Sequence, residues 1–245
     1  MKNYQAQADC LSGKTILITG AGAGIGKTLA LQCAEYGARV ILLGRTIKKL
    51  ETVYDQIEAL GKQQAAILPL DLNEATQQHY QELAETIKRE YGKLDGLVHN
   101  ASQLGILGPF QKIEKSVWDD VMQTNVTAQF LLTKSLIPVL ELAQDASTIF
   151  TTSTVGNQGR AFWGAYSISK FATEGMMQTL ADEYKNTPLR FNAINPGAIR
   201  TAMRASAYPE EDSAQLKTPE EILPSYLYLL SGDSKEVTGQ RINAQ

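Results

Sequence analysis

The sequence predicts an α/β protein with a doubly wound parallel sheet, because short apolar runs alternate along the chain with helical segments of ten or more residues. Right-handed crossovers should then place helices on both faces of the sheet. The predicted strands are 14–19, 39–43, 65–70, 94–99, 147–152 and 189–194, followed by a short last strand after the final helix. The predicted helices are 25–36, 48–60, 74–91, 118–142, 165–184 and 219–230.

Length and composition favour one domain spanning 1–245, since 245 residues with 43% hydrophobic side chains suit a single large core. The net charge of −3 gives no basic footprint for nucleic acid or an anionic membrane. Cys10 and Cys33 form neither a disulfide framework nor a metal motif, so no metal is expected. Without an apolar membrane span or signal segment in the sequence, we expect a cytoplasmic protein.

A glycine-rich loop follows the first strand, with the sequence TGAGAGIG from Thr19 to Gly26. Glycines allow a sharp turn and let a diphosphate approach the amides at a helix N-terminus. The spacing is TGxxxGxG rather than the GxGxxG of other dinucleotide-binding loops. The candidate cofactor contacts in this loop are Gly20, Gly22, Ala23, Gly24, Ile25 and Gly26.

The same loop also resembles a P-loop. Residues 21–28 read AGAGIGKT and depart from GxxxxGK[ST] only at Ala21. A phosphotransferase would use Lys27 and Thr28 on phosphate and metal. Because a strand–loop–helix context suits both interpretations, the loop alone indicates a nucleotide phosphate and leaves the nucleotide open.

The end of the second strand favours NADP. An acidic residue there would bind the adenosine ribose of NAD, but this chain has Gly44 and then Arg45. A guanidinium can bind the 2′-phosphate of NADP through two hydrogen bonds. The alternatives are a surface Arg45 that only starts the next helix, and use of NAD. Asp71 and Leu72 follow the third strand, where Asp71 could bind the adenine amine or cap the next helix.

A tyrosine and a lysine lie four residues apart in YSISK, which places Tyr166 and Lys170 on one face of a predicted helix. Such a pair is common by chance, and its alternative is an exposed phenol beside a solvated lysine. Three polar residues strengthen the catalytic interpretation. Ser153 and Asn100 come at strand ends, where parallel sheets bind ligands. Asn125 lies in the middle of a predicted helix, where asparagine has only a mediocre helix propensity.

These motifs together resemble the classical short-chain dehydrogenase/reductase family from about residue 14 onward. The family shares, in this order, TGAGAGIG, the HNA of residues 99–101, Asn125, Ser153, YSISK and the NPG of residues 195–197. WGAYSISKFATEGMMQTLADEY and NPGAIRTAMRASAYP resemble the YciK-type oxidoreductases of bacteria. The resemblance implies a single-domain Rossmann fold of about seven strands and an NADP-dependent oxidoreductase. Ser102 is a departure, because the family usually has glycine there.

The resemblance implies a catalytic set of Asn125, Ser153, Tyr166 and Lys170. Tyr166 would exchange a proton with the substrate oxygen, and the Lys170 cation would lower the pKa of the phenol by roughly 2–3 units. Ser153 would bind the substrate oxygen, Lys170 the nicotinamide ribose, and Asn125 a water leading to Lys170. The further cofactor contacts implied are Asn100, Ala101, Tyr166, Lys170, Pro196, Gly197, Ile199 and Thr201.

The expected substrate is a small carbonyl or alcohol compound of unknown identity, covered by a loop at about 201–216. Met203, Arg204 and Tyr208 would line one side of its pocket, with Leu104, Ile106, Phe162 and Trp163 opposite. These side chains could equally pack against the body of the protein. Arg160 and Arg204 could bind an acidic group of the substrate or simply be solvated.

Three further expectations concern assembly, function class and the histidines. By analogy with the family, helices 118–142 and 165–184 should pair subunits into a homodimer or homotetramer. A dinucleotide-binding regulatory protein on the same fold is the main alternative, and it predicts damage to the catalytic set. His79 is expected to be solvated and His99 packed in the interior.

Overall fold

The computed structural model describes residues 3–245 and contains one parallel sheet of seven strands in the order β3-β2-β1-β4-β5-β6-β7. The chain order reverses between β1 and β4, which is the switch point where such sheets bind ligands. The strands are β1 Thr15–Thr19, β2 Arg39–Gly44, β3 Ala66–Pro69, β4 Gly96–His99, β5 Ala146–Thr151, β6 Leu189–Asn195 and β7 Arg241–Asn243. The predicted doubly wound fold is confirmed.

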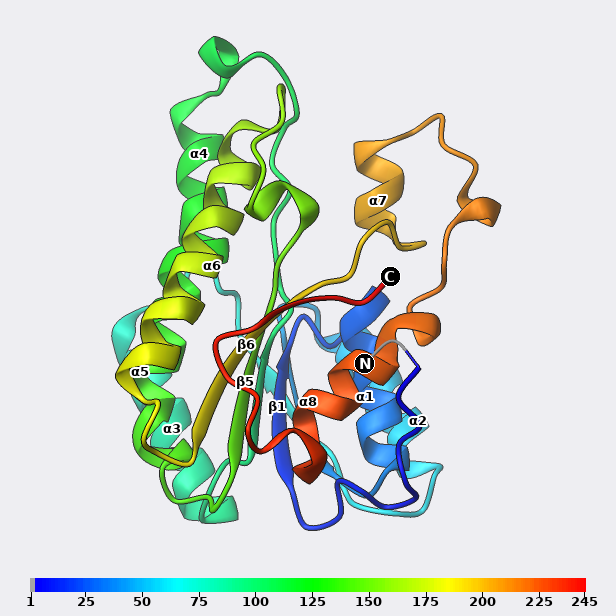
Figure 1. Cartoon of the computed structure of the whole chain (residues 1–245), viewed down its shortest axis with the longest axis vertical. Helices are drawn as coiled ribbons and strands as arrows, with labels where there is room; N and C mark the ends of the chain where they lie inside the picture. Colours follow the sequence, from blue (N-terminus) through cyan, green and yellow to red (C-terminus); the bar gives the residue numbers. More distant parts are fainter. Residues whose placement is uncertain (1–2) are drawn as a thin grey trace.

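Helices cover both faces of the sheet (Figure 1). They are α1 Gly24–Glu35, α2 Ile47–Glu58, α3 Gln77–Tyr91, α4 Lys115–Met122, α5 Ala128–Leu140, α6 Gly164–Glu183, α7 Ala202–Ala207 and α8 Leu223–Leu230. α1, α2 and α8 build one apolar core with the sheet, around Leu29 and Tyr226. α3, α5 and α6 build the other, around Leu132 and Phe191.

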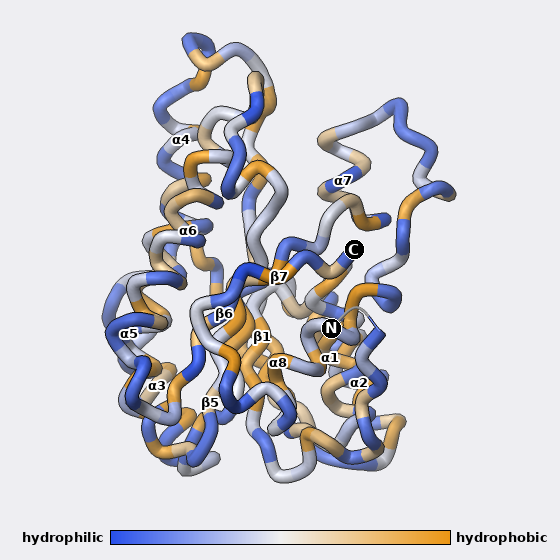
Figure 2. The backbone as a smooth tube through the Cα atoms, viewed as in Figure 1, coloured by the Kyte–Doolittle hydropathy of each residue, from blue (hydrophilic) through white to orange (hydrophobic). Residues whose placement is uncertain are grey.

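The strands read as continuous apolar runs because both faces of the sheet are covered. Every residue of β1, β5 and β6 is buried. Figure 2 shows the hydrophobic segments gathered at the sheet and at the helices packed on it. The resulting rigid layer fixes the positions of the loops that leave the carboxyl ends of the strands.

The predicted helix 118–142 is wrong in its middle. The structure divides it into α4, a π-helical turn at Gln123–Thr127, and α5. The turn carries Asn125, whose side chain binds the main chain of Gln103, so a tertiary contact stabilises the wider turn. Pro138 lies inside α5.

Two other helices begin later than predicted. α3 begins at Gln77 because Thr76 and His79 form a reciprocal capping box, in which His79 Nδ1 accepts from Thr76 N at 3.1 Å. α8 begins at Leu223, after a 3₁₀ turn at Glu220–Ile222. Within the part of the chain that is described, no helix has the length and apolarity to cross a bilayer.

Two arms extend beyond the carboxyl ends of the strands (Figure 1). One contains the loops before α4 and α6, which are joined by a hydrogen bond from Gly108 N to Phe162 O at 2.9 Å. The other contains α7 and the segment after it. Arg200 anchors the base of this second arm by donating to the carbonyls of Ser213, Ala214 and Leu216. A ligand at the switch point would lie between the two arms.

Candidate active site

A cavity of about 400 Å³ opens at the switch point, between the arms. This volume is in the range of small-molecule sites. Most of the residues that the sequence singled out line the cavity: Gly20, Ala23, Gly24, Ile25, Arg45, Asp71, Leu72, Asn100, Ala101, Ser153, Tyr166, Lys170, Pro196, Gly197, Ile199 and Thr201. Among the predicted catalytic and cofactor-binding residues, Gly22, Gly26 and Asn125 do not line it.

The glycine loop turns directly into the N-terminus of α1. Gly20 and Gly24 have φ angles of 68° and 52°, a region that favours glycine. Gly26 is required for packing, because a Cβ there would collide with the main-chain oxygen of Gly20. Gly22 lies against the side chain of Lys49. The loop therefore leaves the first amides of α1 facing the cavity, an arrangement that suits a phosphate group.

The P-loop alternative finds no support in this geometry. Lys27 and Thr28 do not line the cavity. The Thr28 hydroxyl donates to the carbonyl of Gly24 at 3.1 Å, inside α1. The two side chains that a phosphotransferase would aim at phosphate and metal are therefore directed elsewhere.

Asn100 fastens the end of β4 to the glycine loop. Its Nδ2 donates to Thr19 O at 3.1 Å, and the amides of Asn100 and Ala101 both donate to Thr19 Oγ1 at 3.0 Å. Asn100 also lines the cavity, but its side-chain amide is hydrogen-bonded to the glycine loop. Its observed role is to hold the shape of the glycine loop.

The far end of the cavity carries Arg45 and Asp71, at the ends of β2 and β3. Arg45 is exposed, and its guanidinium is the only cationic group lining this end within residues 3–245. Asp71 does not cap α3, whose N-cap is Thr76. Asp71 instead accepts from Asn73 N at 3.0 Å in a tight turn. The side chains at this end suit an adenosine that carries an extra phosphate.

Tyr166 lies in the first turn of α6, with its phenol buried in the cavity. Burial raises the pKa of Tyr166 to about 12, although the hydroxyls of Ser153 and Ser102 lower it. The predicted fall in the pKa of Tyr166 is therefore not observed. The cause is desolvation, which the sequence does not reveal and which outweighs the nearby hydroxyls. The phenol is consequently neutral at ordinary pH and can donate a proton.

Lys170 lies one turn further along α6 and is only 1% exposed. Its Nζ donates to Thr151 O at 2.8 Å and lies 5.5 Å from the centre of the Tyr166 ring. Burial lowers the pKa of Lys170 to about 8, while the charge of Glu174 raises it. The ammonium thus remains positive near neutral pH beside the phenol, as the YSISK spacing predicts.

Asn125 lies behind the cavity, fully buried in the π-helical turn. Its Oδ1 accepts from Gln103 N at 2.7 Å, and its Nδ2 donates to Gln103 O at 2.8 Å and to Ser169 Oγ at 3.0 Å. Asn125 therefore joins the segment after β4 to α6. The water link to Lys170 implied by the family resemblance stays a prediction.

The chain after β6 forms part of the cavity wall. Gly197 has a φ of 75°, and a Cβ there would approach Gln245 within 2.8 Å. Ile199 is buried, and Thr201 caps α7 by accepting from Arg204 N at 3.2 Å. This segment therefore connects the sheet rigidly to the arm that carries α7.

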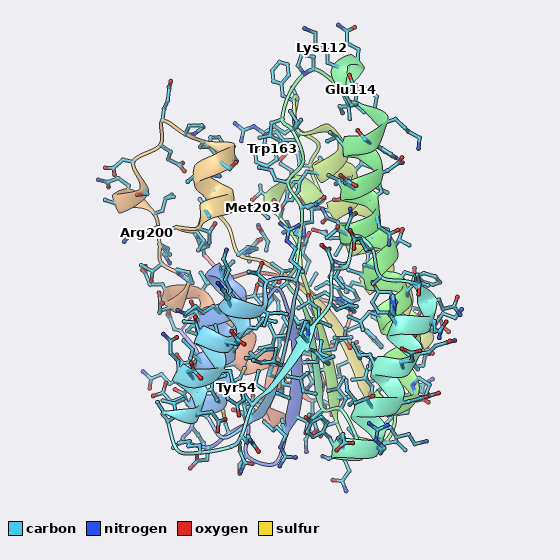
Figure 3. The ribbon with its side chains drawn as sticks, turned by 180° about the vertical axis from the view of Figure 1, so that it is seen from behind. Tyr54, Lys112, Glu114, Trp163, Arg200 and Met203 are labelled. Atoms are coloured by element: carbon cyan, nitrogen blue, oxygen red, sulfur yellow. The ribbon has the colours of Figure 1, made fainter. Side chains whose placement is uncertain are left out.

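The two arms supply the remaining walls of the cavity. Figure 3 shows Trp163 and Met203 on facing elements, Trp163 just before α6 and Met203 on α7. Both line the cavity, together with Leu104 and Arg204. Ile106, Phe162 and Tyr208 do not line it, contrary to expectation. Ile106 and Phe162 instead have mostly exposed side chains.

The arginines near the cavity mouth already have partners. Arg204 forms a two-point ion pair with Glu211, with both N–O distances at 2.6 Å. Arg160 donates to the Tyr208 hydroxyl at 2.6 Å, which joins the two arms. Arg204 is therefore not available as a free cation to bind an acidic substrate.

Sequence reasoning missed three residues of the site. Ser102 was noted only as a departure from the family, but its hydroxyl lies near Tyr166, where it lowers the pKa of the phenol. Glu174, which is buried, and Arg241, which is partly exposed, form an ion pair at the end of β5 with a distance of 2.8 Å between Oε1 and Nε. The spacing of Tyr166, Lys170 and Glu174, four residues apart each time, was the signal that could have found the carboxylate.

His99 is packed, as predicted. It stacks on Phe150 with ring centres 4.9 Å apart, and its Nε2 lies 2.8 Å from Thr133 Oγ1. Burial lowers the pKa of His99 to about 3, so the ring is neutral. No group of three or more His, Cys, Asp or Glu side chains in residues 3–245 is arranged to hold a metal ion.

The short chain dehydrogenase family matches residues 14–212, so this chain belongs to that family. The family predicted from the ordered motifs is confirmed. The uncharacterized oxidoreductase YciK of Escherichia coli K12 is 51% identical over 243 residues, which cover 99% of this chain and 96% of that protein.

Two solved structures are similar along almost the whole chain. A short chain dehydrogenase from Shigella flexneri 2a, complexed with NADP, is 51% identical with a TM-score of 0.95 and covers 98% of this chain and 100% of that one. A short chain dehydrogenase from Escherichia coli CFT073, complexed with NADPH, has the same identity, TM-score and coverage. The cofactor expected from Gly44-Arg45 is thus the one present in these relatives.

Proposed function

We propose that this chain is an NADP-dependent oxidoreductase that transfers a hydride between the nicotinamide and a small carbonyl or alcohol substrate. The observation that carries the proposal is the buried Tyr166 phenol, which lies in the cavity with the Ser153 hydroxyl and the Lys170 ammonium. When bound, the cofactor supplies or accepts the hydride.

Tyr166 provides the proton of the reaction. In the reductive direction its neutral phenol donates the proton from Oη to the substrate oxygen. The phenolate left behind is stabilised by the hydroxyls of Ser153 and Ser102 and by the Lys170 charge. Ser153 also orients the substrate oxygen, because its hydroxyl opens into the same cavity. In the oxidative direction the same groups act in reverse.

The residues that would hold the cofactor fit its parts. The amides at the start of α1 suit the diphosphate, Arg45 suits the 2′-phosphate, and Asp71 lies where an adenine amine could be bound. Arg45 favours NADP over NAD because no carboxylate replaces it at the end of β2. The NADP and NADPH complexes of the Shigella and Escherichia relatives support this choice.

The substrate would bind between the arms, against Trp163, Leu104 and Met203. We propose that residues 201–216 form the substrate loop, anchored at its base by Arg200 and bridged to the other arm through Tyr208. The whole of 1–245 would act as one domain, because a single sheet runs from β1 to β7.

An oligomer is supported by apolar side chains exposed on α5 and α6. Phe130, Ile168 and Phe171 are each more than one third exposed on these two helices. Large exposed apolar side chains on neighbouring helices are typical of an interface. We propose a homodimer or homotetramer, which light scattering after size-exclusion chromatography would measure. The cytoplasmic location stays a prediction.

A screen of ketones and aldehydes with NADPH tests the proposed function. Consumption of NADPH that depends on enzyme and substrate is the expected result. A regulatory dinucleotide-binding protein would bind NADPH without consuming it on any compound. The complete set of Ser153, Tyr166 and Lys170 around one cavity favours the enzyme.

A further inference from the structure

Three consecutive residues at the end of β5 are each bound by a different charged side chain. Two of these charged side chains come from one face of α6, and the third comes from β7. The hydrogen bonds are Lys170 Nζ to Thr151 O at 2.8 Å, Thr152 Oγ1 to Glu174 Oε1 at 2.6 Å, and Arg241 Nη2 to Ser153 O at 3.0 Å. The last of the three residues carries the hydroxyl that faces the substrate.

Glu174 and Arg241 also bind each other. Arg241 Nε donates to Glu174 Oε1 at 2.8 Å, and the side chains of Arg241 and Glu174 are 19% and 7% exposed. Arg241 Nη1 donates in addition to Asn243 Oδ1 at 2.8 Å. The Glu174 charge is buried, and a buried charge is stable only when it is paired and hydrogen-bonded, as it is here by Arg241 and Thr152.

The position of Glu174 follows from the helix. It comes four residues after Lys170 and eight after Tyr166, so the three side chains share one face of α6. Gly156 covers the carboxylate closely, because a Cβ there would lie 2.8 Å from Glu174 Oε1 and 2.5 Å from Thr152 Oγ1. The carboxylate is therefore closely covered by the main chain at Gly156.

We propose that the Glu174–Arg241 ion pair is a positioning device that fixes the end of β5 and keeps Lys170 charged for the chemistry at Tyr166. Arg241 holds Ser153 through its carbonyl, and Glu174 provides the anion beside Lys170. This inference rests on the proposed function. It adds two residues that act through Ser153 and Lys170 and that touch neither substrate nor cofactor.

The charges around Lys170 support the electrostatic part. Tyr166 and Glu174 face it from α6 and His99 faces it from β4, while Arg241 from β7 binds the Glu174 carboxylate. His99 is neutral because burial lowers its pKa to about 3. Glu174 is thus the anion that opposes the effect of burial on Lys170. Without it, Lys170 would lose its proton closer to neutral pH.

Glu174→Gln removes the charge and keeps the shape and an acceptor oxygen for Thr152. The pKa of Lys170, followed by ¹³Cε NMR and assigned with Lys170→Met, should fall by about one pH unit or more. The alkaline limb of kcat for carbonyl reduction should move down by the same amount, with KM for NADPH within twofold. Glu183→Gln, an exposed acid on the same helix, is the matched control and should change neither.

Arg241→Lys tests the positioning of Ser153 separately from the effect of Glu174 on the Lys170 charge. It keeps a cation near Glu174 but cannot bind Glu174, Asn243 and Ser153 O at once. kcat should fall about tenfold or more with little change in KM, since a displaced Ser153 harms only the reacting geometry. If this variant does not fold, Glu174→Gln combined with Arg241→Gln avoids an isolated buried charge. The combined variant should lose kcat and lower the Lys170 pKa as well.

Unchanged kcat, pH profile and Lys170 titration in Glu174→Gln would show that the pair is only structural and overturn the inference. The NMR titration needs no turnover. A wild-type protein inactive on every carbonyl compound would therefore reject the proposed function, and the titration would still decide whether Glu174 controls the Lys170 charge.

Discussion

The Lys170 ammonium lies 5.5 Å from the centre of the Tyr166 ring, and both side chains are buried on one face of α6. Burial disfavours the charged form of both groups, so it shifts their pKa values in opposite directions. It raises the pKa of Tyr166 to about 12 and lowers that of Lys170 to about 8. Around neutral pH the site therefore holds a protonated phenol beside a cation, which is the state needed to protonate a reduced carbonyl oxygen.

Arg45→Ala should weaken NADPH binding about 10- to 100-fold, because it removes charge-assisted hydrogen bonds worth roughly 1.5–3 kcal/mol to the 2′-phosphate. NADH binding should change less than twofold. Isothermal titration with both nucleotides measures the two effects. Arg89→Ala is the control, since Arg89 lies on the surface of α3 paired with Glu90. Equal losses for NADPH and NADH would refute the phosphate contact.

Ser102→Gly should raise the pKa of Tyr166 further, since the Ser102 hydroxyl lowers it. Oxidation of an alcohol needs the phenolate, so the acid limb of that pH profile should move up by about half to one unit when a nearby polar group that favours the phenolate is lost. Ser225→Ala is the matched control, because Ser225 is a buried serine of α8 that does not line the cavity. An unchanged pH profile for Ser102→Gly would show that Ser102 does not influence the pKa of Tyr166.

The stability of the fold should depend on pH through Lys170. Its pKa is about 8 in the folded protein, against 10.5 for a lysine in water, so between these pH values the unfolded chain binds more protons and stability rises with pH. Below pH 8 the buried charge costs about 3 kcal/mol. Lys170→Met should therefore raise the free energy of unfolding near neutral pH, by an amount that shrinks toward pH 10.5. Urea unfolding of both proteins at several pH values tests this, and a difference independent of pH would contradict it.

Gly26→Ala should destabilise the protein by about 1–3 kcal/mol and weaken NADPH binding, because the new Cβ overlaps the Gly20 oxygen and lies 2.5 Å from Asn100 Nδ2. Gly175→Ala is the matched control on α6, where no heavy atom of the described chain lies within 4 Å of the added Cβ. That change should raise stability by up to about 1 kcal/mol. Thermal unfolding with and without NADPH measures both, and a neutral Gly26→Ala would contradict the packing argument.

The sheet and the order of the site residues could be predicted from sequence because both depend on local patterns. Continuous apolar runs identify strands covered on two faces, and the loops that follow them carry Ser153 and Asn100. The π-helical turn could not be predicted, since it depends on the contact of Asn125 with Gln103 in a distant loop. The pairing of Glu174 with Arg241 could not be predicted either, because the two residues are 67 positions apart and only the fold brings them together.

The pKa values of the site residues could not be predicted from the sequence either. The spacing of Tyr166 and Lys170 correctly places a cation near a phenol. It does not reveal how deeply both are buried, and burial reverses the expected direction of the Tyr166 pKa. Likewise, the sequence left Asp71 open between a cofactor contact and a helix cap, and the N-cap of α3 at Thr76 excludes the cap.

Turnover by Tyr166→Phe tests the central claim most directly, because the substitution removes one oxygen atom and keeps the buried ring. With a carbonyl substrate found by the NADPH screen, the variant should bind NADPH with wild-type affinity and lose at least about 10²–10⁴-fold in kcat, the usual contribution of a general acid. A variant that binds NADPH and keeps most of the wild-type kcat would contradict the assignment of Tyr166 as the proton donor.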